Sequence, residues 1–403
     1  MKSQVKFLPQ PNTHDSVEPA IDPSHKPIFL LDWELTLKCN LDCSYCADGT
    51  DTSAGHYSLA DHPDTNECLK TIDFMFKYVD LYMTYKPNWT KQVILNLYGG
   101  ESLTHPDIVA ILEKTKDEYS YYKSKWPLKI TCTTNAIIGP KRMKAVTQYI
   151  EEFTVSYHCE NIPKQNQQFL ANLKIIKESG CDLKVIILMH HDQKYWPELF
   201  EVMNYCEQNS IKYLPRQLDG NFEYNAYQQN WFLNFYKNKT ITKSKKVQEE
   251  ELSNIGEENN SGTMNNVGRA CCGGRNFCAD ENYRKPIPYI VNNNFKNWFC
   301  SVNWFFVYIK QHTRDIYTNK DCIMNFDNVP GPIGSLDHAE DLLIWTEQKL
   351  ASGNMPVIRC AKNKCACGLC APKAKEFKKF KSIMQKHQLQ DTLVDCATRN
   401  TNG

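Results

Sequence analysis

The feature of this 403-residue sequence best suited to chemistry is a group of three cysteines within eight positions. Cys39, Cys43 and Cys46 lie in LTLKCNLDCSYCADG, residues 35–49, with the spacing C-x3-C-x2-C, directly after an apolar run. Cysteine thiolates are the usual protein ligands of iron–sulfur clusters. Three thiolates occupy three corners of a [4Fe–4S] cubane and leave its fourth iron open, whereas a structural zinc site is closed by four ligands. The spacing therefore favours an open cluster site over structural zinc.

The same stretch carries a resemblance to a known family. The C-x3-C-x2-C spacing after a first strand, with the aromatic Tyr45 before the last cysteine, resembles the signature of the radical SAM enzymes. The resemblance covers residues 29–217 in motif order. It implies that S-adenosylmethionine binds the open iron and is cleaved reductively to a 5′-deoxyadenosyl radical, which abstracts hydrogen from a substrate. It also implies an electron donor such as flavodoxin or ferredoxin.

Further motifs follow at the ends of predicted strands, where parallel α/β barrels place their sites. Gly99, Gly100 and Glu101 resemble the family's GGE motif, in which glycines permit close backbone approach and a carboxylate suits the cofactor ammonium. Four more strand-end residues are, by the same resemblance, expected to contact the cofactor: Asn135, Ser156, Leu188 and Arg216. The alternative for Asn135 is that it only caps a turn. For Leu188 and Arg216 the alternative is core packing or a surface ion pair. His158, His190, His191 and Asp219 are candidate proton carriers, and the catalytic residue stays unknown.

Alternating strand-like and helix-like segments must position these residues. Six strand-like runs occur near 29–37 and in QVILNLYGG, PLKITCTTN, EEFTVSYH, CDLKVIILMH and IKYLPRQL, with helical patterns between them. This alternation is typical of βαβ units and a parallel sheet. Six strands are too few to close an eight-stranded barrel. The sequence therefore predicts an α/β fold, a partial (βα)6 TIM-like barrel.

A second group of cysteines lies nearer the C-terminus. Cys300 and Cys322 flank a predicted hairpin, NWFFVYIK and DIYTNKDC, and RCAKNKCACGLC follows. This order is similar to the SPASM or twitch extension, which binds one or two auxiliary [4Fe–4S] clusters, although the dense group here departs from the usual spacing. The candidate ligands are Cys271, Cys272, Cys278, Cys300, Cys322, Cys360, Cys365, Cys367 and Cys370. A zinc module is the alternative, and the number of auxiliary clusters, one or two, stays undecided.

One position separates this chain from sulfatase-maturing relatives. Those relatives carry an Asp base after the second hairpin cysteine, whereas here Ile323 follows and Asp321 precedes it.

The expected domains are an N-terminal arm at 1–27, the barrel at 28–220, an aromatic and charged linker at 221–268, the cysteine-rich auxiliary-cluster domain at 269–372, and a helix and tail at 373–403.

Composition limits the classes of partner. Lys and Arg total 47 and Asp and Glu total 46, for a net charge of +1, so the basic surface of a nucleic-acid binder is not expected. The longest dense apolar run, WFFVYI, is too short to span a bilayer, and the N-terminus lacks the apolar core of a signal peptide. With 18 cysteines, metal ligation in a reducing compartment is favoured over disulfides. We therefore expect a cytoplasmic protein without membrane or nucleic-acid partners.

Three functions remain compatible with these features. The first is radical SAM chemistry on a peptide or protein side chain, as an oxidation, a crosslink or an epimerisation. The second is radical SAM chemistry on a small metabolite or cofactor precursor. The third, from another class, is a cysteine-rich metal-binding scaffold without catalysis.

Overall fold

The computed structural model describes residues 16–17, 28–46, 61–86, 90, 92–218, 222–232, 234–235, 295–319, 322, 324–361 and 373–386. The main sheet within them contains nine strands: β2 (Ile28–Thr36), β3 (Gln92–Gly99), β4 (Leu128–Thr134), β5 (Glu152–Tyr157), β6 (Asp182–Met189), β7 (Lys212–Gln217), β9 (Phe306–Lys310), β10 (Asp315–Tyr317) and β11 (Gly334–Ser335). Their spatial order is β11-β10-β9-β2-β3-β4-β5-β6-β7.

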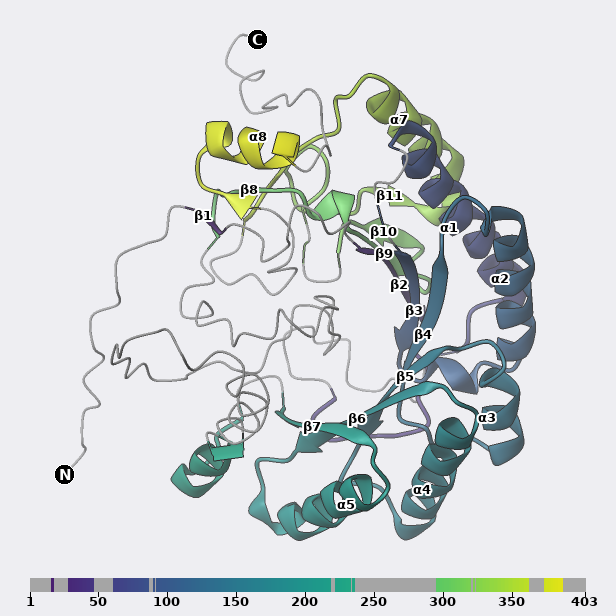
Figure 1. Ribbon diagram of the computed structural model, residues 1–403, viewed down its shortest axis with the longest axis vertical. Helices are drawn as coiled ribbons and strands as arrows, with labels where there is room; N and C mark the ends of the chain where they lie inside the picture. Colours follow the sequence, from purple (N-terminus) through teal and green to yellow (C-terminus); the bar gives the residue numbers. More distant parts are fainter. Residues whose placement is uncertain are drawn as a thin grey trace, which may run out of the picture.

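All six predicted barrel strands are present, and β2 to β7 pair in parallel in the order of the chain. The helices between them are α1 (Thr65–Tyr85), α2 (Ile108–Tyr122), α3 (Pro140–Val146), α4 (Pro163–Glu178) and α5 (Trp196–Gln208). Figure 1 shows these helices along the outer side of a curved, open sheet. Single turns of 3-10 helix lie at Ser102–Thr104, Gln193–Tyr195, Val302–Trp304 and Leu336–His338. The predicted partial TIM-like α/β architecture is therefore confirmed.

The alternation of side chains in β2 separates the two faces of the sheet. Trp33 Nε1 and the α1 hydroxyl of Thr71 both donate to Gln311 Oε1, at 3.0 and 2.9 Å, so the odd-numbered side chains face the helices. Successive strand residues point to opposite faces, which places Asp32 and Glu34 on the inner, concave face. The helix-facing residues are almost fully buried: Phe29, Leu31, Trp33 and Leu35. Apolar burial against α1 thus fixes which residues face the barrel interior.

The predicted hairpin forms, but it extends the barrel sheet. β9 pairs in parallel with β2, with Leu30 opposite Phe306, and β10 pairs antiparallel with β9. Helix α7 (Ala339–Ala351) packs beside α1 on the outer side (Figure 1). The sequence placed this hairpin in a separate domain beginning at 269. In the structure β2 would otherwise be an edge strand of the barrel, and β9 pairs its exposed backbone groups.

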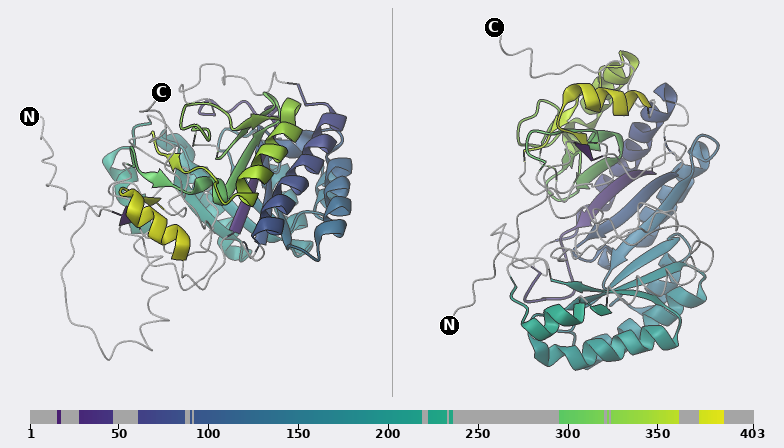
Figure 2. Two further views of the ribbon diagram at one scale, coloured as in Figure 1. Left: turned by 90° about the horizontal axis from the view of Figure 1, so that it is seen from above. Right: turned by 60° about the vertical axis from the view of Figure 1, so that its left-hand side comes forward.

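A second sheet of four short strands contains β1 (Ser16–Val17), β13 (Lys373–Ala374), β8 (Phe299–Cys300) and β12 (Ile358–Arg359), in that order. Helix α8 (Phe377–Lys386) covers it, and the rings of Phe299 and Phe377 lie 5.0 Å apart. Figure 2 shows α8 beside this sheet. The helix expected within residues 373–403 therefore spans Phe377–Lys386 and packs on this sheet. No helix in the described part of the chain is long and apolar enough to cross a membrane.

The start of the predicted linker packs on the barrel. Residues 226–232 are helical. The Trp231 ring lies 5.4 Å from that of Trp196 and 5.6 Å from that of Phe200, both on α5. Such aromatic packing buries large areas of apolar surface, so this segment covers the end of the barrel beside β7.

Candidate functional site

The three N-terminal cysteines lie in one loop that leaves the carboxyl end of β2. Cys39 and Cys43 are half-buried, and Cys46 is exposed. Burial is the largest cause that raises the pKa of the Cys39 thiol to about 11 and that of the Cys43 thiol to about 12, and charge on the neighbouring thiols contributes to both values. The three cysteines lie at the edge of the sheet where parallel barrels place their sites.

Two glycines hold this loop against the end of β3. The backbone N–H of Gly100 donates to Thr36 O at 2.8 Å. A Cβ on Gly99 would lie 2.1 Å from Thr36 O, and one on Gly100 would lie 2.4 Å from Leu37 O. Gly99 also has a φ of 139°, which L side chains rarely adopt. The glycines permit the close approach of the backbone that leads into Cys39, and their predicted contact with the cofactor stays a prediction.

Glu101 is fully buried and joins the ends of β3 and β4. Its carboxylate accepts hydrogen bonds from the backbone N–H of Asn135 at 2.6 Å, from Thr134 Oγ1 at 2.8 Å and from the backbone N–H of Leu103 at 3.1 Å. Burial raises the pKa of Glu101 to about 7, against the lowering effect of these donors. In this arrangement the carboxylate is directed at protein donors. Its backbone N–H donates to Lys38 O at 2.8 Å and so also holds the cysteine loop.

Asn135, at the end of β4, reaches the first cysteine. Its Nδ2 lies 3.8 Å from Cys39 Sγ and donates to Asn40 Oδ1 at 2.8 Å. The next residue, Ala136, has a φ of 56°, in the left-handed region. Asn172 of α4 donates to the Ala136 carbonyl at 2.8 Å. A strained non-glycine turn held in this way is typical of functional sites, and here it directs Asn135 at the loop.

Side chains after β5 reach the second cysteine and the two residues that follow it. His158 Nδ1 lies 3.2 Å from Cys43 Sγ and 3.0 Å from the Tyr45 hydroxyl. The Glu160 carboxylate accepts from the Ser44 backbone N–H at 2.7 Å and from its hydroxyl at 2.5 Å. The loop is therefore fixed by the ends of three consecutive strands, β3, β4 and β5.

Tyr45, predicted to contact the cofactor, is itself buried by protein. Only 7% of it is exposed, its ring stacks on His158 at 6.0 Å, and its edge meets His190 at 5.6 Å. Burial lowers the pKa of His158 to about 4 and also lowers that of His190, so both imidazoles are neutral near pH 7. The His191 ring stacks on His190 at 4.4 Å. Three histidines named from the sequence thus gather behind the cysteine loop.

The remaining predicted cofactor residues lie along the inner face of the sheet. Leu188 and Arg216 are opposite one another on β6 and β7, and Ser156 is opposite Ile186. Register partners in a sheet share a face. The Tyr157 ring packs on α4 through Phe169 at 4.9 Å, which directs the preceding Ser156 inward. All three predicted residues are half-buried.

Sequence reasoning missed a polar and aromatic group on the inner face of β9, β2 and β3. The Tyr308 hydroxyl donates to Glu34 Oε2 at 2.6 Å. The Tyr98 ring stacks on Tyr308 at 5.9 Å, and Lys310 Nζ lies 6.0 Å from the Tyr308 ring centroid. The only sequence signal was the pair of acids in the apolar strand IFLLDWELT. Nothing in the local sequence pairs β9 with β2, so the group could not be assembled beforehand.

Two of the C-terminal cysteines are near one another. Cys300 is opposite Ile358 on neighbouring strands, and the backbone of Cys360 bonds to that of Asn297 at 2.7 Å and Trp298 at 3.0 Å. Cys300, Cys322 and Cys360 are all buried. Outside the described residues lie Cys271, Cys272, Cys278, Cys365, Cys367 and Cys370, together with Asp219, Asp321 and Ile323.

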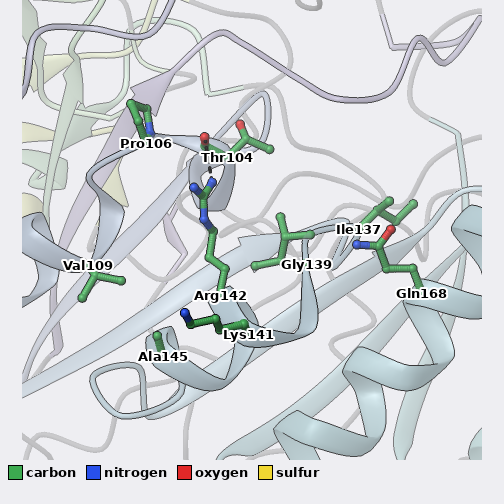
Figure 3. A pocket seen from close by; sticks show the side chains of 10 residues that line it. Thr104, Pro106, Val109, Ile137, Gly139, Lys141, Arg142, Ala145 and Gln168 are labelled. Carbon is green, nitrogen blue, oxygen red and sulfur yellow. Dashed lines mark hydrogen bonds between the residues drawn. The ribbon is translucent and has the colours of Figure 1, made fainter.

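A separate surface pocket lies on the outer side of the barrel, among α2, α3 and the start of α4 (Figure 3). Arg142 projects into it and donates to Thr104 O at 3.2 Å. Ile137, Val109 and Ala145 make much of its wall apolar. Ile137 of this wall lies in the loop after β4, and its carbonyl accepts a hydrogen bond from Asn40 Nδ2, so the pocket borders the back of the cysteine loop.

The three thiols of the cysteine loop are the donor type that an iron–sulfur cluster takes. In the part of the chain that the structure describes, no group of three His, Cys, Asp or Glu side chains forms a site for a single metal ion. A cubane attaches each thiolate to a different iron, so its ligands do not converge on one point. Three thiols in one anchored loop suit that geometry.

No family model and no curated protein matches the chain. Solved structures do match. One is native anSMEcpe with bound AdoMet, which is 12% identical with a TM-score of 0.35. The match covers 48% of this chain and 52% of that chain, which is about half of its length. A second anSMEcpe structure, with bound AdoMet and Kp18Cys peptide, is 12% identical with a TM-score of 0.47, over 80% and 82%. Methylornithine synthase (PylB) is 12% identical with a TM-score of 0.32, over 48% and 55%. The anSMEcpe structures are of a radical SAM enzyme.

Proposed function

We propose that this protein is a radical SAM enzyme that binds a [4Fe–4S] cluster through Cys39, Cys43 and Cys46. The observation that carries the proposal is the anchoring of the cysteine loop by the ends of β3, β4 and β5, with polar side chains directed at Cys39 and Cys43. A loop held in this way presents three thiols at the carboxyl edge of a parallel barrel. When bound, the cluster and S-adenosylmethionine supply reductive C–S cleavage and hydrogen-atom abstraction.

The chain's own residues would orient the cofactor and the substrate. Gly99 and Gly100 let the cysteine loop pack against the end of β3, and Ser156, Leu188 and Arg216 line the inner face where the nucleoside and carboxylate would lie. Holding the reacting atoms in line and excluding water is the protein's share of such chemistry.

A proton acceptor is available on the same face. An oxidation removes one hydrogen atom from the substrate and then one electron and one proton. Glu34, hydrogen-bonded to Tyr308 at 2.6 Å, would accept that proton at the substrate-facing side of β2 and β9. The electron would pass to an auxiliary iron–sulfur cluster held by the C-terminal cysteines, of which Cys300 and Cys360 lie on adjoining segments.

The substrate class we propose is a peptide or protein side chain, because the C-terminal cysteines resemble an extension common in enzymes that modify peptides. Oxidation, crosslinking and epimerisation all begin with the same hydrogen abstraction. A small metabolite or cofactor precursor is the second candidate. Flavodoxin or ferredoxin would supply the electron for S-adenosylmethionine cleavage.

Anaerobic reconstitution with iron and sulfide tests the proposal. We expect a brown protein with a [4Fe–4S] spectrum and about four, eight or twelve irons per chain, for one, two or three clusters. Reduced protein should release 5′-deoxyadenosine from S-adenosylmethionine, and C39A, C43A and C46A should each abolish the release. C68A, a buried cysteine on α1, is the matched control and should retain it. A colourless zinc protein would show that the chain is a metal-binding scaffold instead.

A further inference from the structure

One cysteine of the loop is surrounded differently from the other two. Cys43 Sγ lies 3.2 Å from His158 Nδ1, whereas Cys39 Sγ has amide partners only, at 3.8 and 3.9 Å. Cys46 is exposed to solvent. The three thiolates of a cluster bound here would therefore be electronically unequal.

We propose that His158 and Tyr45 are positioning residues that hydrogen-bond to the Cys43 thiolate and raise the reduction potential of the cluster. This inference rests on the proposed cluster site. Hydrogen bonds to the sulfur ligands are one of the determinants of iron–sulfur reduction potentials. They stabilise the added negative charge of the reduced cluster, because a donor interacts more strongly with a more negative sulfur.

The geometry places His158 on the sulfur of Cys43 and Tyr45 beside His158. His158 Nδ1 is 3.0 Å from the Tyr45 hydroxyl, so the imidazole, the phenol and the thiol form a triangle. If the Nδ1 proton of His158 is directed at the sulfur, the phenol proton of Tyr45 cannot go to Nδ1 and is free to turn toward the Cys43 thiolate. A thiolate accepts only, so the imidazole N–H and the phenol O–H can both donate to it.

The two donors are rigidly supported. The Tyr45 and His158 rings are nearly parallel, with an interplanar angle of 2°, and the His190 ring packs edge-on against Tyr45 at 5.6 Å. Glu160 holds the intervening Ser44 through its backbone N–H at 2.7 Å. Buried, fixed donors cost no reorganisation on reduction, which is why their effect on a thiolate is large.

The test is a redox titration of the reconstituted full chain followed by EPR. Any auxiliary clusters are separated by following only the signal that changes when S-adenosylmethionine is added. We expect H158L and Y45F each to shift the midpoint potential negatively, by about 59 mV for a tenfold change in a one-electron equilibrium. In H158Q, which retains an N–H donor, the midpoint potential should return most of the way to the wild-type value. H338L is the matched control, because His338 is exposed just before α7 and its ring lies beside Asp341.

The outcomes distinguish the two proposals. A wild-type chain that holds no cluster overturns the proposed function itself. A wild-type chain that holds the cluster, with H158L and Y45F at an unchanged midpoint, overturns only the inference. If H158L and Y45F lose the cluster but H158Q retains it at the wild-type midpoint, the N–H donor is still required and the inference stands. Loss of iron in all three variants would mean that the pair only shapes the loop, and would overturn it.

Discussion

The carboxylate of Glu101 accepts a hydrogen bond from the backbone N–H of Asn135 at 2.6 Å, and the Asn135 side chain in turn lies 3.8 Å from Cys39 Sγ. The end of β3, the end of β4 and the first cysteine are thus connected through two residues. Glu101 is fully buried, so its protonation is coupled to the stability of this edge of the barrel.

The first prediction concerns the pH dependence of stability. The pKa of Glu101 rises from 4.5 in the unfolded chain to about 7 in the folded one. Between these values the folded chain keeps a proton that the unfolded chain has lost. The contribution of Glu101 to the free energy of unfolding is therefore full below pH 4.5 and falls, by about 3 kcal/mol, as pH rises to 7.

Urea unfolding of the wild type and E101Q at several pH values measures this contribution. The difference in free energy of unfolding between the two should decrease from acid to neutral pH and then level off. E113Q, a change at an exposed carboxylate on α2, is the control and should leave the pH profile unaltered. A difference that stays constant between wild type and E101Q would contradict the prediction.

The second prediction is that G100A prevents loading of the cysteine loop. A Cβ at this position would lie 2.4 Å from the carbonyl oxygens of both Leu37 and Lys38, and backbone atoms cannot yield as a side-chain end can. We expect a loss of about 1–3 kcal/mol in stability and of most cluster iron. G139A is the matched control, since nothing lies within 4 Å of its added methyl group. Iron content and thermal unfolding are the measurements, and equal iron in both variants would refute the close contact.

The third prediction tests whether β9 belongs to the barrel. Gln311 follows β9 and accepts from Trp33 of β2 at 3.0 Å and Thr71 of α1 at 2.9 Å. Q311A leaves the buried Trp33 Nε1 without its acceptor, whereas Thr71 Oγ1 still donates to Glu67 O at 3.0 Å, so we expect a loss of about 1–3 kcal/mol. The neighbouring exposed His312 gives the control, H312A, which should change stability by less than about 0.5 kcal/mol. Similar values for the two variants would place β9 elsewhere.

The fourth prediction concerns the inner-face pair. A double-mutant cycle of E34Q and Y308F should give a coupling energy of about 1–3 kcal/mol, because the 2.6 Å hydrogen bond is charge-assisted and half-buried. The same cycle on Glu113 and Tyr149, a pair at 2.9 Å on the exposed outer surface, should give less than about 0.5 kcal/mol. Denaturant unfolding measures both, and a coupling for Glu34 no larger than that for Glu113 would contradict the geometry.

The sequence by itself determined the barrel strands and the position of the candidate site. The six strands of β2 to β7 were predictable because each apolar run alternates with a helical pattern, and local periodicity reflects burial directly. The position of Cys39, Cys43 and Cys46 followed from the same logic, since residues after parallel strands meet at one edge. Short-range order in the chain was enough for both.

Only the tertiary structure decided what surrounds these cysteines. Gly100 contacts the backbone of Leu37, Glu101 bonds to the end of the next strand, and Tyr45 faces His158. These residues are up to 113 positions apart in the chain, and local periodicity does not encode such contacts. The pairing of β9 with β2 spans a still longer separation and moves Tyr308 into the barrel. Such pairings depend on which strand edge is left uncovered once the helices have packed, and that is a property of the assembled fold.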